Sequence, residues 1–116
     1  MKKLIFMLAL GCFVAVNFSS CKSKTDSPEK VVEAFLKYMS EGDFDKAIPL
    51  STPETAEMLR EWQKDGFNLY QGNVIENIEC EMISGTEAEC SFYADGSRAM
   101  IEAVKTDGKW LVHMEK

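Results

Sequence analysis

Carboxylates are the most abundant groups in this 116-residue chain that could take part in chemistry. The chain has 19 Asp and Glu residues, 13 Lys and Arg residues and a single His, which give a net charge of −6. One His nearly excludes a nucleophile–His–acid triad or a His-rich metal site, and no nucleophile elbow, phosphate loop or zinc spacing occurs. The acidic balance, without a Lys or Arg cluster, argues against a nucleic-acid partner. We expect no cofactor.

A row of three glutamates and the single His is the most unusual polar group in the sequence. The strand pairing derived below places Glu81, Glu89, Glu102 and His113 side by side across four strands. Like charges directly opposite each other destabilise a sheet, so this row needs an explanation. One explanation is a hard divalent cation such as Ca²⁺, which carboxylates bind well. The other is a solvated acidic face, the commoner reason for surface charge, and we therefore assign no metal.

The strands that would align this row are indicated by a change of apolar period from 3.6 to 2 in the C-terminal part of the chain. Asp95-Gly96 and Asp107-Gly108 are type I′ hairpin signals, and a three-residue loop over 84–86 forms the first turn. A two-residue loop there would place Met82 opposite Glu89 and mix the two faces, so we reject it. One face of the resulting four-stranded antiparallel meander is apolar: Ile78, Cys80, Met82, Ala88, Cys90, Phe92, Ala99, Ile101, Ala103, Trp110, Val112 and Met114.

The same registers make specific pairings that the structure can test. They place Ile78 opposite Phe92 and Ile101 opposite Met114. Glu76 is then the only strand acid on the inward face, at the frayed start of the first strand. The outward face exposes four apolar residues, which could form a dimer interface: Ile75, Met100, Val104 and Leu111.

Amphipathic helices precede the sheet and must cover its apolar face, which predicts an α+β fold of N-terminal helices on the meander. Apolar residues recur every three to four positions after Ser27, and Pro28 follows as the first helical residue. A capping box of Ser51 and Glu54 starts the last helix. Asp43 can cap a short helix over 44–48, and the expected helix ends are Gly42, Pro49 and Gly66.

The N-terminal segment has the features of a signal peptide over residues 1–20. Lys2 and Lys3 precede an apolar run, Leu4–Val16, that is too short to span a bilayer. The stretch "FSSC", ending at Cys21, resembles the lipobox of bacterial lipoproteins. The resemblance implies that Cys21 is diacylated and becomes the first residue of the mature chain, anchored to a membrane. The alternative is a plain secreted protein in which Cys21 is incidental.

The remaining segments are a tether over 21–27 and one small domain over 28–116. The tether, "KSKTDS" after the cysteine, lacks the acidic run that often follows it in surface-exposed relatives. We therefore expect an outer-membrane location with the domain facing the periplasm.

Two longer stretches, "SPEKVVEAFLKYMSEGDFDKAIPLST" and "VKTDGKWLV", carry a family resemblance. They resemble the opening helix and final hairpin of small bacterial lipoproteins with a lumazine-binding-like domain of unknown function. That domain belongs to the cystatin-like, or nuclear transport factor 2-like, superfamily. The resemblance implies a sheet curled around helices, often with a pocket between them. Because its motifs concern packing and turns, it supports the fold more than any chemistry.

The pocket implied by this resemblance gives three alternatives for function. The first is binding of a small apolar or aromatic ligand or of a partner protein; the second is an enzyme, and the third a dimerisation module. Catalysis of the isomerase type needs a carboxylate base inside the pocket, and none is evident. Aromatic residues that could line the pocket, or simply fill the core, are Tyr38, Trp62, Phe67, Tyr70, Phe92 and Trp110.

Cys80 and Cys90 are the last candidates for chemistry. If Cys12 leaves with the signal peptide and Cys21 is acylated, they are the two remaining thiols in an oxidising compartment. The register places them directly opposite each other, within the range of a disulfide. The alternative is a pair of free thiols packed in the core.

Overall fold

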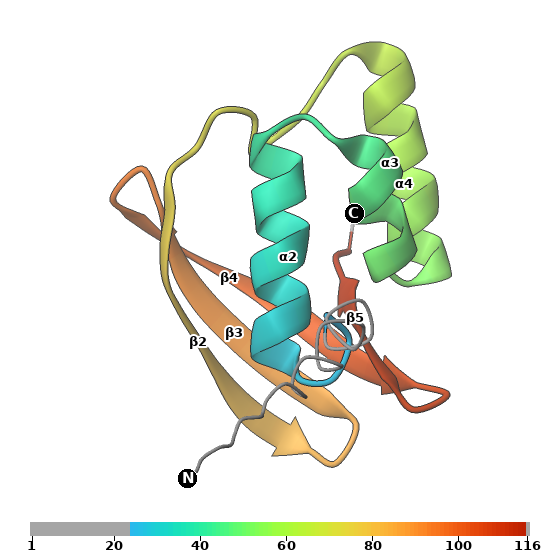
Figure 1. The fold of residues 1–116 in the computed structure, drawn as a ribbon, viewed down its shortest axis with the longest axis vertical. Coiled ribbons are helices and arrows are strands. Elements are labelled where there is room, and N and C mark those ends of the chain that lie inside the picture. Colours follow the sequence, from blue (N-terminus) through green and yellow to red (C-terminus); the bar gives the residue numbers. More distant parts are fainter. Residues whose placement is uncertain (1–23, 116) are drawn as a thin grey trace, which may run out of the picture.

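The computed structural model describes residues 24–115, and it confirms the predicted α+β architecture (Figure 1). Three helices and a 3₁₀ turn precede a four-stranded antiparallel meander in the order β2-β3-β4-β5. None of the described helices is long and apolar enough to cross a membrane. The elements are α2 Pro28–Ser40, α3 Phe44–Ala47, η2 Ile48–Leu50, α4 Pro53–Asp65, β2 Ile75–Ser84, β3 Glu87–Ala94, β4 Ser97–Thr106 and β5 Lys109–His113.

Polar caps define the helix starts. The Ser27 hydroxyl accepts a hydrogen bond from the Lys30 amide at 3.2 Å, and Asp43 caps α3 in the same way, as predicted. The expected cap of α4 is wrong by one residue, because Thr52 caps this helix instead of Ser51. The Ser51 hydroxyl donates to the Ile48 carbonyl at 2.6 Å, and its backbone bridges to Val112, so it is not available as a cap.

The predicted pairing of the last three strands is confirmed except at the end of β5. Phe92 lies opposite Ala99, and Ala103 lies between Ala88 and Val112. Asp95 and Asp107 have φ angles of 53° and 52°, and the glycines that follow them are also at positive φ. These values are those of type I′ turns, whose twist matches the twist of the flanking strands.

A β-bulge near the start of β2 corrects the predicted register there. Glu79 pairs with Ser91, but Glu76 pairs with Tyr93, so two residues on β2 oppose one on β3. Asn77 takes the left-handed conformation that this irregularity needs, with φ 56°. The bulge reverses the parity beyond it. Ile75 therefore packs against the core, whereas Glu76, expected inside, is exposed.

The β2–β3 turn also differs from the three-residue loop that we predicted. Ser84 pairs with Glu87 across a two-residue turn, and a second register shift lies between Met82 and Ser84. This shift compensates for the shorter turn, so Met82 still pairs with Ala88 as expected. Met82 nevertheless is 52% exposed, because the hairpin tip extends past the start of α2 (Figure 1).

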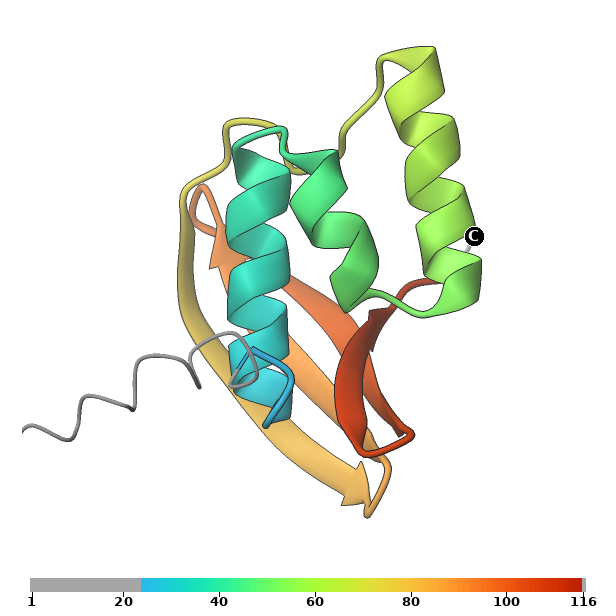
Figure 2. The same cartoon turned by 45° about the vertical axis from the view of Figure 1, so that its right-hand side comes forward.

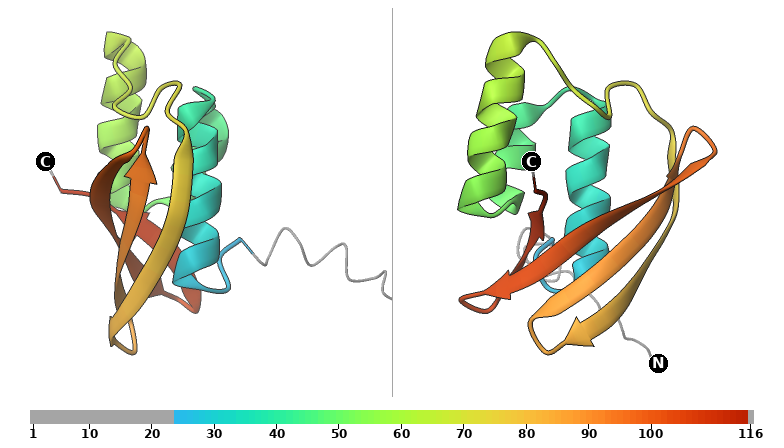
Figure 3. Two further views of the ribbon diagram at one scale, coloured as in Figure 1. Left: turned by 90° about the vertical axis from the view of Figure 1, so that its left-hand side faces the viewer. Right: turned by 180° about the vertical axis from the view of Figure 1, so that it is seen from behind.

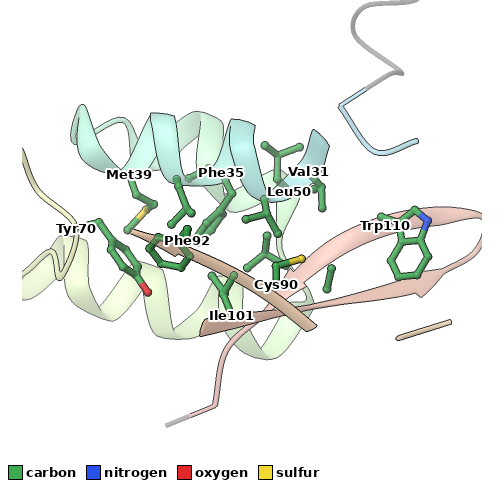
Figure 4. Close-up of a cluster of buried hydrophobic side chains, with 14 of the residues drawn as sticks. Val31, Phe35, Met39, Leu50, Tyr70, Cys90, Phe92, Ile101 and Trp110 are labelled. Atoms are coloured by element: carbon green, nitrogen blue, oxygen red, sulfur yellow. The ribbon is translucent and has the colours of Figure 1, made fainter. Parts of the chain in front are cut away.

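The core lies between α2 and the concave face of the sheet. Helix α2 runs across the strands with α3 beside it, whereas α4 is farther from the sheet (Figure 2). Seen from behind, the opposite face of the sheet is not covered by any helix within residues 24–115 (Figure 3). The fully buried side chains include Phe35, Phe92, Leu36, Met39 and Leu59 (Figure 4).

Candidate functional site: a cleft between α4 and the sheet

A cleft of about 700 Å³ separates α4 from the end of the sheet, and we call it the α4 cleft. Helix α4, the segment that follows it, the middle of β4, Glu89 of β3, and the end of β5 with the two residues after it form its walls. Its volume lies within the range of small-molecule sites. The lining residues are Met58, Glu61, Trp62, Leu69, Tyr70, Glu89, Met100, Ile101, Glu102, His113, Met114 and Glu115.

The cleft exists because the chain leaves the sheet after His113. The Met114 amide donates to Thr55 Oγ1 at 2.8 Å, and this hydroxyl donates to the Met114 carbonyl at 3.2 Å. Both backbone groups of Met114 thus bind the start of α4. The predicted pairing of Met114 with Ile101 is therefore wrong, since β5 pairs with β4 only as far as Glu102 opposite His113. The edge of β4 beyond this point borders the cleft.

One wall of the cleft is apolar and aromatic. The Trp62 and Phe67 rings meet edge to face, with centroids 5.1 Å apart, so Phe67 holds Trp62 from the side. Phe67 itself is 50% exposed and does not line the cleft. Met100, which we expected on an outward dimer surface, is 47% exposed and reaches the cleft from the edge of β4.

Tyr70 joins the cleft to the core. Its ring meets Phe92 edge to face at 6.0 Å, and its hydroxyl lies at the end of the ring remote from Met39 (Figure 4). Burial raises the pKa of the Tyr70 phenol, because the charged form would lose solvation. The hydroxyl therefore stays protonated at neutral pH and can donate a hydrogen bond.

The other wall of the cleft is acidic, and it contains part of the predicted row. The registers place Glu81 opposite Glu89, Glu89 opposite Glu102, and Glu102 opposite His113, as the sequence predicted. Glu81, on β2, does not line the cleft. Glu115 adds a carboxylate that the sequence did not indicate, with Oε2 at 3.8 Å from His113 Nε2.

This end of the row is compact enough to hold a cation. Three residues can each offer one ligand atom, and these atoms lie within 4.8 Å of one another: Glu102, His113 and Glu115. Both carboxylates are exposed, and exposed acidic groups commonly occur without a bound ion. A metal site here stays a prediction.

A chain of hydrogen bonds assigns the proton on His113. The Thr55 hydroxyl donates its only hydrogen to the Met114 carbonyl. In the 3.0 Å hydrogen bond between the Thr52 and Thr55 hydroxyls, Thr52 must therefore be the donor. Thr52 Oγ1 can then only accept from His113 Nδ1, which lies 2.9 Å away. His113 Nδ1 therefore carries a proton, and Nε2 is the nitrogen that presents a lone pair in the neutral ring.

The six predicted aromatic residues do not form one site. Trp62 and Tyr70 line the cleft, whereas Phe92 and Trp110 are buried in the core. Tyr38, on α2, is partly buried against the core, and its hydroxyl accepts a hydrogen bond from Lys24 Nζ. Lys46 Nζ lies 5.8 Å from the centre of the Tyr38 ring.

The structure contains a disulfide between Cys80 and Cys90, which are direct register partners with Cα atoms 3.9 Å apart. Cys90 is fully buried and Cys80 partly so, which places the bridge inside the β2–β3 hairpin. Cys21 and the signal peptide lie outside the described residues.

The predicted dimer surface is only partly as expected. Val104 and Leu111 pair with each other and are half-buried, but Ile75 faces inward because of the bulge. Dimerisation through this face stays a prediction, which light scattering on the domain tests.

Several cleft residues were missed from the sequence. Met58, Glu61 and Leu69 line the cleft but were not predicted to belong to a site. A signal was available: Met58, Glu61 and Trp62 are spaced to lie on one side of a helix, so an acid interrupts the apolar stripe.

No family model matches this chain, and no curated protein matches it either.

Proposed function

We propose that the chain is a lipid-anchored periplasmic protein of the outer membrane whose domain binds a small apolar or aromatic ligand in the α4 cleft. The observation that carries the proposal is the cleft itself, with Trp62, Tyr70 and three methionines among its lining residues. Concave sites with apolar and aromatic walls and a few polar groups are typical of ligand binding. The resemblance to small lipoproteins with a lumazine-binding-like domain supports the anchor and the pocket.

Binding is favoured over catalysis by the placement of the acids. A general base with a raised pKa needs a carboxylate shielded from water. The buried polar residues of the described chain are Ser51, Thr52 and Thr55, whereas the cleft carboxylates Glu89 and Glu102 are exposed. The same cleft in an enzyme is the alternative, and turnover of a bound ligand would reveal it.

Fluorescence of a neutral aromatic dye, N-phenyl-1-naphthylamine, tests the cleft. We expect the dye to brighten on binding, and Trp62→Ala to weaken its affinity by about tenfold through lost apolar contact. Tyr38→Ala is the matched control, because it removes an aromatic ring outside the cleft. Absence of dye binding, or equal loss in both variants, contradicts the proposal.

Membrane fractionation tests the anchor independently. Cys21→Ala should release the protein from the membrane fraction, since stable anchoring depends on the acyl chains. Cys12→Ala, within the predicted signal peptide, is the control and should leave fractionation unchanged. A Cys21→Ala protein that sediments with membranes as the wild type does contradicts lipidation.

A further inference from the structure

The α4 cleft offers hydrogen-bond acceptors and negative charge, and from this we propose that it selects cationic ligands. The class that we infer is a small protonated amine with an apolar or aromatic body. This inference rests on the proposed function of the cleft and adds the chemistry of its ligand.

Among the described residues that line the cleft, acidic side chains predominate over basic ones. Four of its lining residues are glutamates, and among the described residues no Lys or Arg lines it. Glu89 and Glu102 lie directly opposite each other on adjacent strands, an arrangement that costs stability in the free protein. A positive group placed against them removes this repulsion, so binding of a cation is favoured relative to a neutral group of the same shape.

His113 adds a further acceptor to this wall. Because Nδ1 carries the proton that Thr52 Oγ1 accepts, Nε2 is the acceptor atom of the neutral ring, and it lies 3.8 Å from Glu115 Oε2. Two acceptors then face each other without a hydrogen between them. An ammonium group has several N–H donors and no acceptor, and it can bridge such a pair.

The apolar wall distinguishes an organic cation from a metal ion. Trp62 and Tyr70 present aromatic rings, and Met58, Met100 and Met114 present flexible apolar side chains. Aromatic faces attract ammonium groups, and methionines adapt to varied apolar shapes. An inorganic cation would use the carboxylates alone and leave this wall in contact with water. A ligand with both an ammonium group and an apolar body contacts both walls.

Three phenyl compounds that differ only in their charged end test the inference. The probes are 4-phenylbutylamine, 4-phenylbutan-1-ol and 4-phenylbutanoate, titrated at low salt with EDTA present to remove metal ions. We expect the amine to bind at least about fivefold more tightly than the alcohol, and the carboxylate most weakly. Added salt should reduce this preference, because part of the cleft is open to water.

Charge-neutral variants locate the effect. Glu102→Gln and Glu89→Gln should each lower amine affinity several-fold, and lower alcohol affinity by a clearly smaller factor. Glu81→Gln is the matched control, because Glu81 belongs to the same row but does not line the cleft. An equal loss in the control would show that overall charge, and not the cleft, determines the preference, and would overturn the inference.

The remaining outcomes separate the inference from the proposed function. Equal affinities for amine and alcohol overturn cation selection, while the cleft remains a binding site. If the dye binds but none of the three phenyl compounds does, cation selection is again overturned. If the dye also fails to bind, the proposed function itself fails.

Discussion

Helices α2 and α4 relate to the sheet in different ways. Helix α2 contacts all four strands and contributes five apolar side chains with no exposed surface, Val31, Val32, Phe35, Leu36 and Met39. Helix α4 has the same length but contacts only β5 among the strands closely, and a cleft of about 700 Å³ lies beside it. Packing closes the side of the sheet that α2 covers, which we call the closed half. The α4 side, where the cleft lies along the β4 edge and includes residues of the opposite sheet face, is the open half.

The distribution of buried residues along α4 explains the difference. Its buried side chains are Thr55, Ala56, Met58 and Leu59, all in its N-terminal half. The C-terminal half carries Trp62, which is half-buried, and then only polar residues as far as Gly66. Helix α4 is thus fastened at one end, whereas α2 is buried along its whole length. The comparison teaches that an apolar stripe must extend along a helix to close a sheet face.

Removal of one large ring from each region should show the largest contrast. Phe92→Ala leaves a void in the closed half and should lower the free energy of unfolding by about 3–5 kcal/mol. Trp62→Ala should cost less than half of that, because this ring is already partly exposed. Urea denaturation of both variants measures the difference. Equal losses would mean that the α4 side is packed as tightly as the α2 side.

The disulfide belongs to the closed half and should contribute next. Cys80→Ala combined with Cys90→Ala opens a short loop and should lower the free energy of unfolding by at most about 2–3 kcal/mol. Dye binding in the α4 cleft should not change. Intact mass after alkylation of the denatured, unreduced protein checks the bond directly: two alkyl groups on the wild type would show free thiols.

Thr55 fastens the open half, and its hydroxyl should matter for both stability and binding. Thr55→Val leaves the partly buried Met114 amide without its acceptor, which should cost about 1–3 kcal/mol in urea denaturation. Without this bond the chain can follow β4 further and narrow the cleft, so dye affinity should fall. Thr55→Ser keeps the hydroxyl and is the control. An unchanged dye affinity in Thr55→Val would remove the link between this bond and the cleft.

The smallest effect should be a gain in stability from the acidic wall. Glu89→Gln removes repulsion with Glu81 and Glu102 and should raise the free energy of unfolding by about 0.2–1 kcal/mol at low salt. The gain should shrink as salt screens the charges. Glu79→Gln is the control, because Glu79 lies opposite Ser91 and meets no like charge across the β2–β3 pair. A gain of the same size in the control would point to net charge.

The closed half was predictable from the sequence because its signals are local. The Asp-Gly turns determine the pairing of β3, β4 and β5, and the period of α2 identifies its buried face. The open half depends on contacts between distant residues. Nothing near Met114 in the sequence shows that its amide binds Thr55, 59 positions away.

The bulge at Asn77 escaped prediction for a different reason. Strict alternation of inward and outward residues, counted back from Ile78, places Glu76 inside. An extra residue in the strand places the apolar Ile75 inside instead, and this is the arrangement in the structure. Asn tolerates positive φ better than most residues, so Asn77 was the available hint. The tolerance of Asn for positive φ allows the bulge, and the burial of Ile75 in the core favours it.

The hydrogen bond from the Trp110 amide to the Thr25 carbonyl, 2.9 Å long, has a geometric consequence for a lipid-anchored protein. It fastens the chain to β5 only four positions after Cys21. A fully extended linker of that length spans about 14 Å, roughly half the thickness of a bilayer's hydrocarbon core. If Cys21 carries the anchor, the domain diffuses in two dimensions within a thin layer above the lipid head groups. The cleft would then be confined to that layer, so its ligand would have to reach the membrane surface to be bound.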